Sequence, residues 1–112
     1  MINLKIHLRE HDAVIVAYLL NSLKKYTKKA LIKQHGKDEG KSKYEVYKDL
    51  MKSFKNAERK DDIFVIDVKR DQYSMLKDFL EGYIKKVKQE DENHKDLQQL
   101  EIIHTKIKGV SA

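Results

Sequence analysis

Apolar residues change their spacing early in the sequence, and this change limits the elements that the first third of the chain can form. Through residues 1–8 apolar and polar residues alternate strictly, with apolar residues at Ile2, Leu4, Ile6 and Leu8. Alternation is the pattern of a strand with one buried face. Over residues 10–34 the apolar residues recur every three or four positions, which is the pattern of an amphipathic helix. The sequence therefore predicts a half-buried strand followed directly by one long helix.

The same change of spacing occurs a second time. Residues 63–68, Ile-Phe-Val-Ile-Asp-Val, are rich in β-branched and aromatic residues and too few for a helix, so they predict a second strand. Helical spacing follows over residues 71–88 and returns over residues 97–107. Another amphipathic helix, over residues 42–58, precedes the second strand, and the polar residues between the two predict a loop.

A shift of the chain by 60 residues brings its two halves into register, since Ile6 then meets Ile66 and Leu20 meets Leu80. An internal repeat and a shared pattern without common ancestry both fit this observation. A repeat would relate the halves by a pseudo-twofold axis, pair the strands antiparallel and place the helices on one face. We predict one α+β domain over residues 1–112, made of two strand-helix-helix units, with a two-stranded antiparallel sheet packed against about four helices.

The second strand has apolar residues on both of its faces. Ile63 and Val65 lie on the face opposite to Phe64 and Ile66. A strand of this kind is usually covered on both sides. The sequence therefore predicts that a further helix or a second copy of the chain covers Ile63 and Val65. A homodimer is therefore one alternative, and its contact would be this strand or the last helix.

The stretch His-Gly-Lys-Asp-Glu-Gly-Lys-Ser, residues 35–42, resembles a phosphate-binding P-loop but is one residue short of that motif. A P-loop also joins a strand to a helix, whereas helical patterns lie on both sides of this stretch. Gly36 suits the C-terminal end of a helix. Ser42 and Glu45 have the spacing of a capping box at the start of the next helix. We interpret the stretch as a turn between two helices.

Cysteine usage and hydropathy exclude several classes of protein. The chain contains no cysteine, so neither a disulfide nor a thiolate metal site can form. Its longest purely apolar run covers only residues 13–20, whereas a membrane helix needs roughly 20 residues. No basic and then apolar signal segment begins the chain. We expect a cytoplasmic protein that does not contact a membrane.

No group of residues has the spacing of a known catalytic centre. His11 and Asp12 are adjacent, as in metal-dependent phosphohydrolases, but the partner histidine on a separate upstream helix is missing, and solvated residues of a first helical turn are the expected alternative. Asp61, Asp62 and Asp67 have no histidine, nucleophile motif or glycine-rich loop nearby, which favours roles in a turn and at a strand edge. We expect a protein that is not an enzyme and needs no cofactor and no metal.

Positive charge is concentrated in one segment. The chain has a formal net charge of +6, and residues 24–60 contain 13 Lys or Arg against 5 Asp or Glu. On two successive helices this segment predicts a lysine-rich hairpin on which a polyanion can dock. The lysines that we expect to contact nucleic acid are Lys24, Lys25, Lys28, Lys29, Lys33, Lys41, Lys43, Lys48, Lys52 and Lys55. Tyrosines of the same segment can stack on bases, namely Tyr26, Tyr44 and Tyr47, although Tyr26 and Tyr47 also lie near core faces of their helices.

Two functions remain open at this stage. The first is a small regulatory protein that binds nucleic acid or a nucleoprotein through the lysine-rich hairpin. The second is an inhibitor or accessory subunit that binds a protein partner through an apolar or acidic surface of residues 61–107. A solvated lysine-rich surface that only keeps the protein soluble would carry no binding function.

Overall fold

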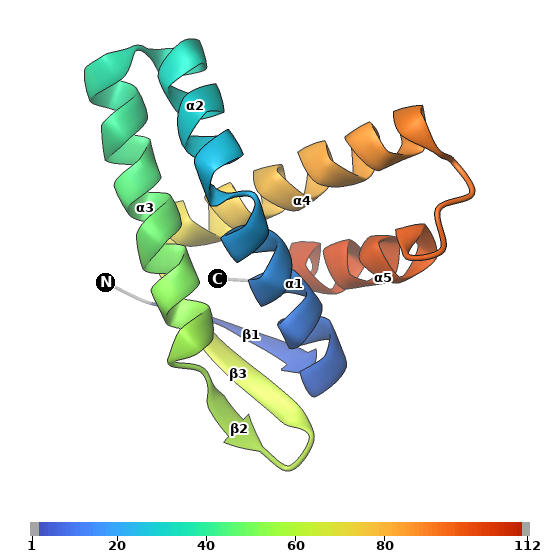
Figure 1. Ribbon diagram of the computed structural model, residues 1–112. Helices are drawn as coiled ribbons and strands as arrows, with labels where there is room; N and C mark the ends of the chain where they lie inside the picture. The colour runs from blue at the N-terminus through green and yellow to red at the C-terminus, as the bar shows by residue number, and fades with distance from the viewer. Residues whose placement is uncertain (1–2, 111–112) are drawn as a thin grey trace.

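The computed structural model describes residues 3–110 and contains an α+β fold (Figure 1). These residues form a three-stranded sheet and five helices rather than the expected two strands and four helices. The strands are β1 (Leu4–Arg9), β2 (Glu58–Lys60) and β3 (Ile63–Val68). The helices are α1 (Glu10–Ser22), α2 (Lys24–His35), α3 (Lys37–Lys55), α4 (Arg70–Glu90) and α5 (Leu97–Lys108). Ile2, which we assigned to the first strand, lies outside the described residues.

The two predicted strands pair antiparallel at the centre of the fold. β1 pairs with β3 so that Ile6 stands opposite Ile66 and Leu4 opposite Val68. The apolar residues of β1 are buried, and the polar residues between them are exposed. The alternating pattern therefore gave the correct face of the sheet.

The third strand, β2, was expected to be a loop. It pairs with β3 on the side away from β1 and gives the strand order β1-β3-β2. Its three residues, Glu-Arg-Lys, are all exposed, so no hydrophobic pattern indicated a strand. The hairpin turn places Asp61 at a positive φ of 58°, which Asp and Asn tolerate better than most residues. A short and charged edge strand of this kind discourages pairing with another chain.

On the second face of β3, Val65 is buried within a single chain, whereas Ile63 is half-buried and Asp67 is exposed. Val65 stands between His7 of β1 and Glu58 of β2 and is only 8% exposed. The expected cover by a further helix or by a second copy is therefore not needed for this side chain. A homodimer stays one of the alternatives.

The core lies between the sheet and the helices. Side chains from the inner face of β1 and β3 join apolar side chains of α1, α3, α4 and α5 in one cluster. Leu20, Tyr47, Leu76 and Ile103 represent the four helices in this cluster, and each is fully buried. α3 contacts β3, and α5 contacts β1, so the last helix of each half packs against the strand of the other half. The expected order of strand, helix and helix is present in the second half, whereas the first half has three helices, α1, α2 and α3, after its strand. The internal repeat stays a prediction.

The long helix predicted over residues 10–34 is interrupted at Leu23. This residue leaves the helical conformation, with φ −101° and ψ 9°, and separates α1 from α2. The carbonyl oxygen of Leu20 accepts a hydrogen bond from the buried Tyr47 hydroxyl of α3. In a continuous helix that oxygen would bond the amide of Lys24. The tertiary contact from α3 thus coincides with the interruption, which the sequence pattern of α1 and α2 does not show.

The stretch that resembles a P-loop is a turn between helices, and it is tighter than expected. Gly36 has a φ of 88° and is the only residue between α2 and α3. Gly40 already belongs to α3, and a Cβ atom at this residue would lie 2.6 Å from the Cα of Ile32 in α2. Close approach of the two helices therefore requires glycine here. Ser42 lies inside α3, so the predicted capping box with Glu45 does not form.

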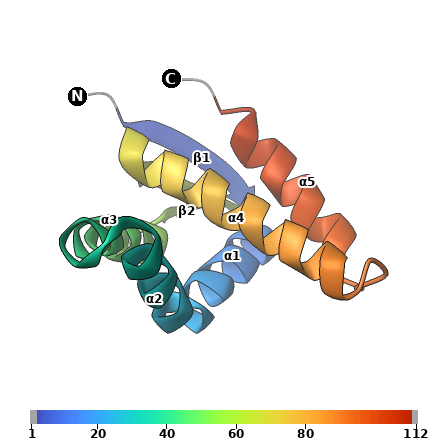
Figure 2. The same ribbon diagram turned by 90° about the horizontal axis from the view of Figure 1, so that it is seen from above.

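Two helical arms extend from the sheet in different directions (Figures 1 and 2). One arm is α2 with the adjoining part of α3, and the other is α4 with α5. The Cα positions span 42 × 40 × 23 Å, so the molecule is flat. α2 has no buried residue at all. Its place in the fold therefore depends on its contact with α3.

Candidate nucleic-acid interface

The predicted lysines of α2 lie on two different sides of the helix. Lys24 and Lys28 are four residues apart and share one side. Lys25, Lys29 and Lys33 follow each other at the same spacing on another side and are exposed. One helix therefore presents its positive charges in two directions, and Lys28 of the first group reaches Tyr44 of α3.

Lysines of α2 and α3 meet around Tyr44. The ammonium of Lys28 lies 5.4 Å from the centre of the Tyr44 ring, and that of Lys48 lies 5.6 Å from it. The ring itself stacks on the buried ring of Tyr47, with centroids 5.8 Å apart and an angle of 16° between the planes. This stacking holds the Tyr44 ring in place. The lysine ammonium groups of both helices therefore lie close to the same tyrosine ring.

Glu45 is the negative residue in this group. Its carboxylate pairs with the ammonium of Lys48 at 2.8 Å. This hydrogen bond lowers the pKa of Glu45, and the charges of Lys48, Lys52 and Lys28 act in the same direction. The same contact raises the pKa of Lys48. Three lysines thus surround one carboxylate, and the group keeps an excess of positive charge.

A groove between α1 and α3 continues this basic group. It has a volume of about 480 Å³ and is lined by Lys48, Lys52 and Lys55 of α3 together with Asn21 of α1. Its floor is apolar and consists of Ala17, Leu20, Met51 and Phe54. Lysine stems can lie on such a floor while their ammonium groups stay in water. We call Lys28, Lys48, Lys52, Lys55 and the Tyr44 ring between them the basic groove.

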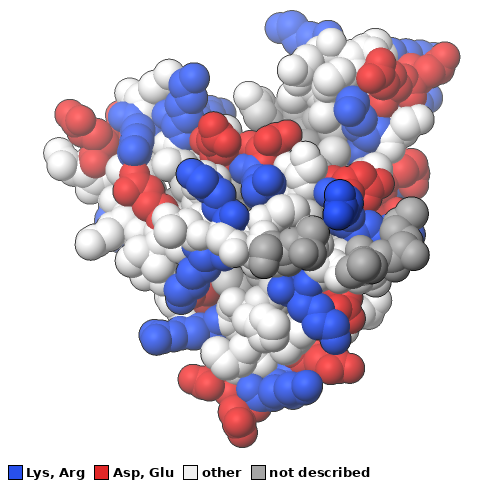
Figure 3. Space-filling view, turned by 180° about the vertical axis from the view of Figure 1, so that it is seen from behind, with Lys and Arg blue, Asp and Glu red and all other residues white. Residues whose placement is uncertain are grey.

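The other predicted residues do not all join the basic groove. Lys41 shares the helix side of Glu45 but lies near the far end of the arm, and Lys43 shares the side of the buried Tyr47. Tyr47 is fully buried in the core, which was the alternative to stacking on a base. Asn21, which lines the groove, was not expected there, because no motif or charge distinguishes this residue in the sequence. On the face opposite to that of Figure 1, positive and negative side chains are interspersed (Figure 3).

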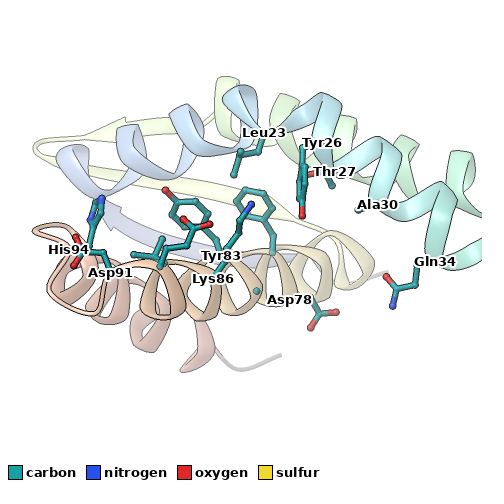
Figure 4. A pocket seen from close by; sticks show the side chains of 14 residues that line it. Leu23, Tyr26, Thr27, Ala30, Gln34, Asp78, Tyr83, Lys86, Asp91 and His94 are labelled. Atoms are coloured by element: carbon teal, nitrogen blue, oxygen red, sulfur yellow. The ribbon is translucent and has the colours of Figure 1, made fainter.

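A second and larger cavity lies between the two arms (Figure 4). It has a volume of about 580 Å³ and is formed by α2 on one side and α4 with the following loop on the other. Its lining contains three aromatic rings, those of Tyr26, Phe79 and Tyr83. The polar lining residues of α4 and the loop are Asp78, Lys86, Glu90, Asp91 and His94. We call this cavity the interarm cleft.

The adjacent His11 and Asp12 do not form a metal site. Asp12 was expected to be solvated, yet it is only 2% exposed. Its carboxylate accepts hydrogen bonds from Gln99 at 2.6 Å and from Lys106 at 3.4 Å, both on α5. Among residues 3–110 no group of three or more His, Cys, Asp or Glu side chains could hold a metal ion.

The aspartates around β3 take turn and edge positions. Asp61 and Asp62 form the hairpin turn, and Asp67 pairs with Lys5 at 4.0 Å on the exposed face of the sheet.

None of the helices within residues 3–110 is both long and apolar enough to cross a membrane. Comparison with family models, with curated proteins and with solved structures finds no match to this chain.

Proposed function

We propose that this protein is a non-enzymatic binding protein that contacts nucleic acid, or a nucleoprotein, through the basic groove. The observation that carries the proposal is the meeting of Lys28 and Lys48, from two different helices, over the Tyr44 ring. Lys52 and Lys55 extend the positive charge along α3 beside the same groove. Phosphate groups of a strand that follows α3 would meet these ammonium groups in succession.

Lysine chemistry favours binding to the backbone over the reading of bases. An ammonium acts as a point charge, whereas bidentate contacts to guanine need the planar guanidinium. The chain has only three arginines, Arg9, Arg59 and Arg70, and none lies in the basic groove. Arg59 is engaged with Glu10 at 3.3 Å. We therefore expect similar affinity for nucleic acids of different sequence.

The salt dependence of binding tests the proposal. Phosphate neutralisation releases counterions, so affinity for a mixed-sequence duplex should fall steeply between about 50 and 200 mM salt. The triple variant Lys28→Gln, Lys48→Gln, Lys52→Gln should bind at least about tenfold more weakly and show a shallower salt slope. Fluorescence anisotropy of a labelled duplex measures both quantities.

A matched control separates the groove from net charge. The variant Lys25→Gln, Lys29→Gln, Lys33→Gln removes the same charge from the same arm but on the other side of α2. It should retain most of the affinity. Equal losses of affinity in both variants would show that net charge, and not the basic groove, is responsible for binding. No binding of nucleic acid at low salt would refute the proposal.

A protein-binding function is the second candidate. It is supported by the interarm cleft, in which α4 and the following loop present aromatic and acidic residues within the segment 61–107. This cleft lies on a different side of α2 from the basic groove. The two candidates therefore do not exclude each other.

We also infer that the two strand-helix-helix units are an internal repeat. The pairing of β1 with β3 is centred on Ile6 and Ile66, which a shift of 60 residues relates. The two buried polar residues within the described chain, Asp12 and Gln72, are related by the same shift. Each contacts the last helix of the other unit: Asp12 contacts α5, and Gln72 lies 3.3 Å from the Ser53 hydroxyl of α3. A pseudo-twofold axis accounts for all of these pairs.

Superposition in an experimental structure tests the repeat. Residues 4–22 should superpose on residues 64–82 after a rotation close to a half turn about an axis between Ile6 and Ile66. A rotation far from a half turn, or a different path of the chain in the two segments, would leave only a shared hydrophobic pattern.

A further inference from the structure

Gly82 leaves open space in the lining of the interarm cleft. It lies in the middle of α4, where glycine costs about 0.5 to 1 kcal/mol relative to alanine. Its φ is not in the left-handed region, and a Cβ atom built on it meets nothing within 4 Å. Neither the backbone nor the packing therefore requires glycine here. What the missing side chain leaves is free space in the lining of the cleft.

Aromatic rings line the cleft, and a lysine ammonium of the chain itself already lies against one of them. The Tyr26 side chain of α2 is 61% exposed, and the ammonium of Lys86 from α4 lies 4.7 Å from the centre of its ring. Figure 4 shows both side chains pointing into the cleft from opposite arms. A cation over a tyrosine face is a favourable arrangement. The cleft thus has a place for an ammonium or guanidinium group.

The charge of the lining favours a cation over an anion. Lys86 is outnumbered by three carboxylates, those of Asp78, Glu90 and Asp91. Phosphate groups would meet repulsion from these carboxylates. The lining also includes the apolar side chains of Leu23, Ala30 and Val87, which we call the floor of the cleft. A ligand that fits has an apolar part for this floor and a positive charge beside it.

The cleft continues into a neighbouring groove. This groove has a volume of about 430 Å³, lies between α1 and the start of α5, and shares Tyr83 and His94 with the cleft. Its lining includes Val14 and Tyr18, the latter 69% exposed, and the acidic Asp96. The combined surface is elongated, aromatic and edged by carboxylates. This shape suits an extended chain better than a compact small molecule.

We propose that the interarm cleft binds a basic peptide segment of a partner protein, with an apolar side chain on the floor and a Lys or Arg against Tyr26 and the carboxylates. The incoming cation takes the place of the Lys86 ammonium over the Tyr26 ring. This proposal does not depend on the basic groove, because the two surfaces use different residues. Charge complementarity and the space left by Gly82 carry it.

Three short synthetic peptides test the proposal. One alternates Lys or Arg with Leu, a second replaces the basic residues by Glu, and a third keeps the basic residues but replaces Leu by Gly. Fluorescence anisotropy with labelled peptides measures the affinity of the full-length protein for each. Only the first peptide should bind well, and a comparable affinity for the acidic peptide, or no binding of any of the three, would overturn the proposal.

Substitutions in the cleft locate the binding. Gly82→Leu fills the open space and should weaken binding of the first peptide by about tenfold or more, a loss of about 1.4 kcal/mol. Ser74→Leu adds the same side chain at an exposed position of α4 outside the cleft and should leave the affinity unchanged. Thermal unfolding of both variants checks that the fold is intact. Equal affinity of the Gly82→Leu variant and the parent would overturn the proposal.

The sign of the charge effect decides the class of ligand. Lys86→Gln removes the competing cation, so the basic peptide should bind this variant more tightly than the parent. Glu90→Gln with Asp91→Asn should weaken binding of the same peptide. The opposite result, weaker binding after Lys86→Gln, would mean that the cleft takes an anion and would refute the proposal.

Discussion

Glycine occurs at Gly36, Gly40 and Gly82 for three different reasons. Gly36 needs a positive φ, and Gly40 needs to be without a Cβ because the backbone of α2 passes it. Gly82 needs neither. At the scale of single residues, glycine therefore lies in a turn at Gly36, at a close contact of two helices at Gly40 and beside open space in the cleft at Gly82. Only the structure distinguishes these three cases.

Alanine substitutions should have opposite effects at two of these positions. Gly40→Ala places a Cβ against the backbone of Ile32, so we expect a loss of about 1 to 3 kcal/mol in the free energy of unfolding. Gly82→Ala should gain up to about 1 kcal/mol, because alanine is the better helix former and meets no obstacle. Denaturant unfolding measures both. A Gly40→Ala variant as stable as the parent would contradict the close contact of α2 and α3.

Tyr47 should make stability fall at high pH. Burial raises the pKa of its hydroxyl from 10.0 to about 12, so the folded state favours the neutral phenol. Its contribution is complete below pH 10 and is lost as the pH rises toward 12, by about 2 to 3 kcal/mol. Unfolding of the parent and of Tyr47→Phe should therefore be compared across this range. Parallel pH dependence of the two proteins would show that this hydroxyl does not contribute.

Burial differs strongly among the helices. α4 buries six residues, whereas α2 buries none and is held mainly by α3. Helical spacing in the sequence is present in both and does not reveal this difference. At the scale of elements, α2 is thus the helix with the least apolar support.

Hydrogen exchange should follow this difference. Segments with few buried contacts open at low free energy. Backbone amides of the last two turns of α2 should therefore exchange at least about tenfold faster than those in the middle of α4. Mass spectrometry of peptic fragments gives both rates. Equal protection would mean that α2 opens only together with the whole domain.

The three-stranded sheet buries Val65 on its outer face without a second copy, while Ile63 is half-buried. β2 lies beside β3, and Val65 is buried between the two neighbouring strands. We therefore expect light scattering to give a mass near 13.3 kDa for the protein alone at moderate salt. Twice this mass would support the homodimer and would point to the last helix or the cleft as the contact.

The local hydrophobic pattern predicted much of the fold. Ile6 and Ile66 were placed on paired strands, and α4 and α5 were found within two residues at each end. The prediction failed at β2, whose exposed charged residues carry no pattern, and at Leu23, where the interruption coincides with a contact from α3. The sequence also could not predict which of the ten lysines lie along the same groove.

The sequence alone determined the class of fold, the inner face of the sheet and the basic character of residues 24–60, because periodicity and charge are properties of neighbouring residues. The tertiary structure decided where α1 ends, how Lys28 and Lys48 meet over Tyr44, and that two arms enclose the interarm cleft. These features depend on residues far apart in the chain. They form when helices pack against one another, and the angle between two packed helices cannot be inferred from the spacing of apolar residues within one helix.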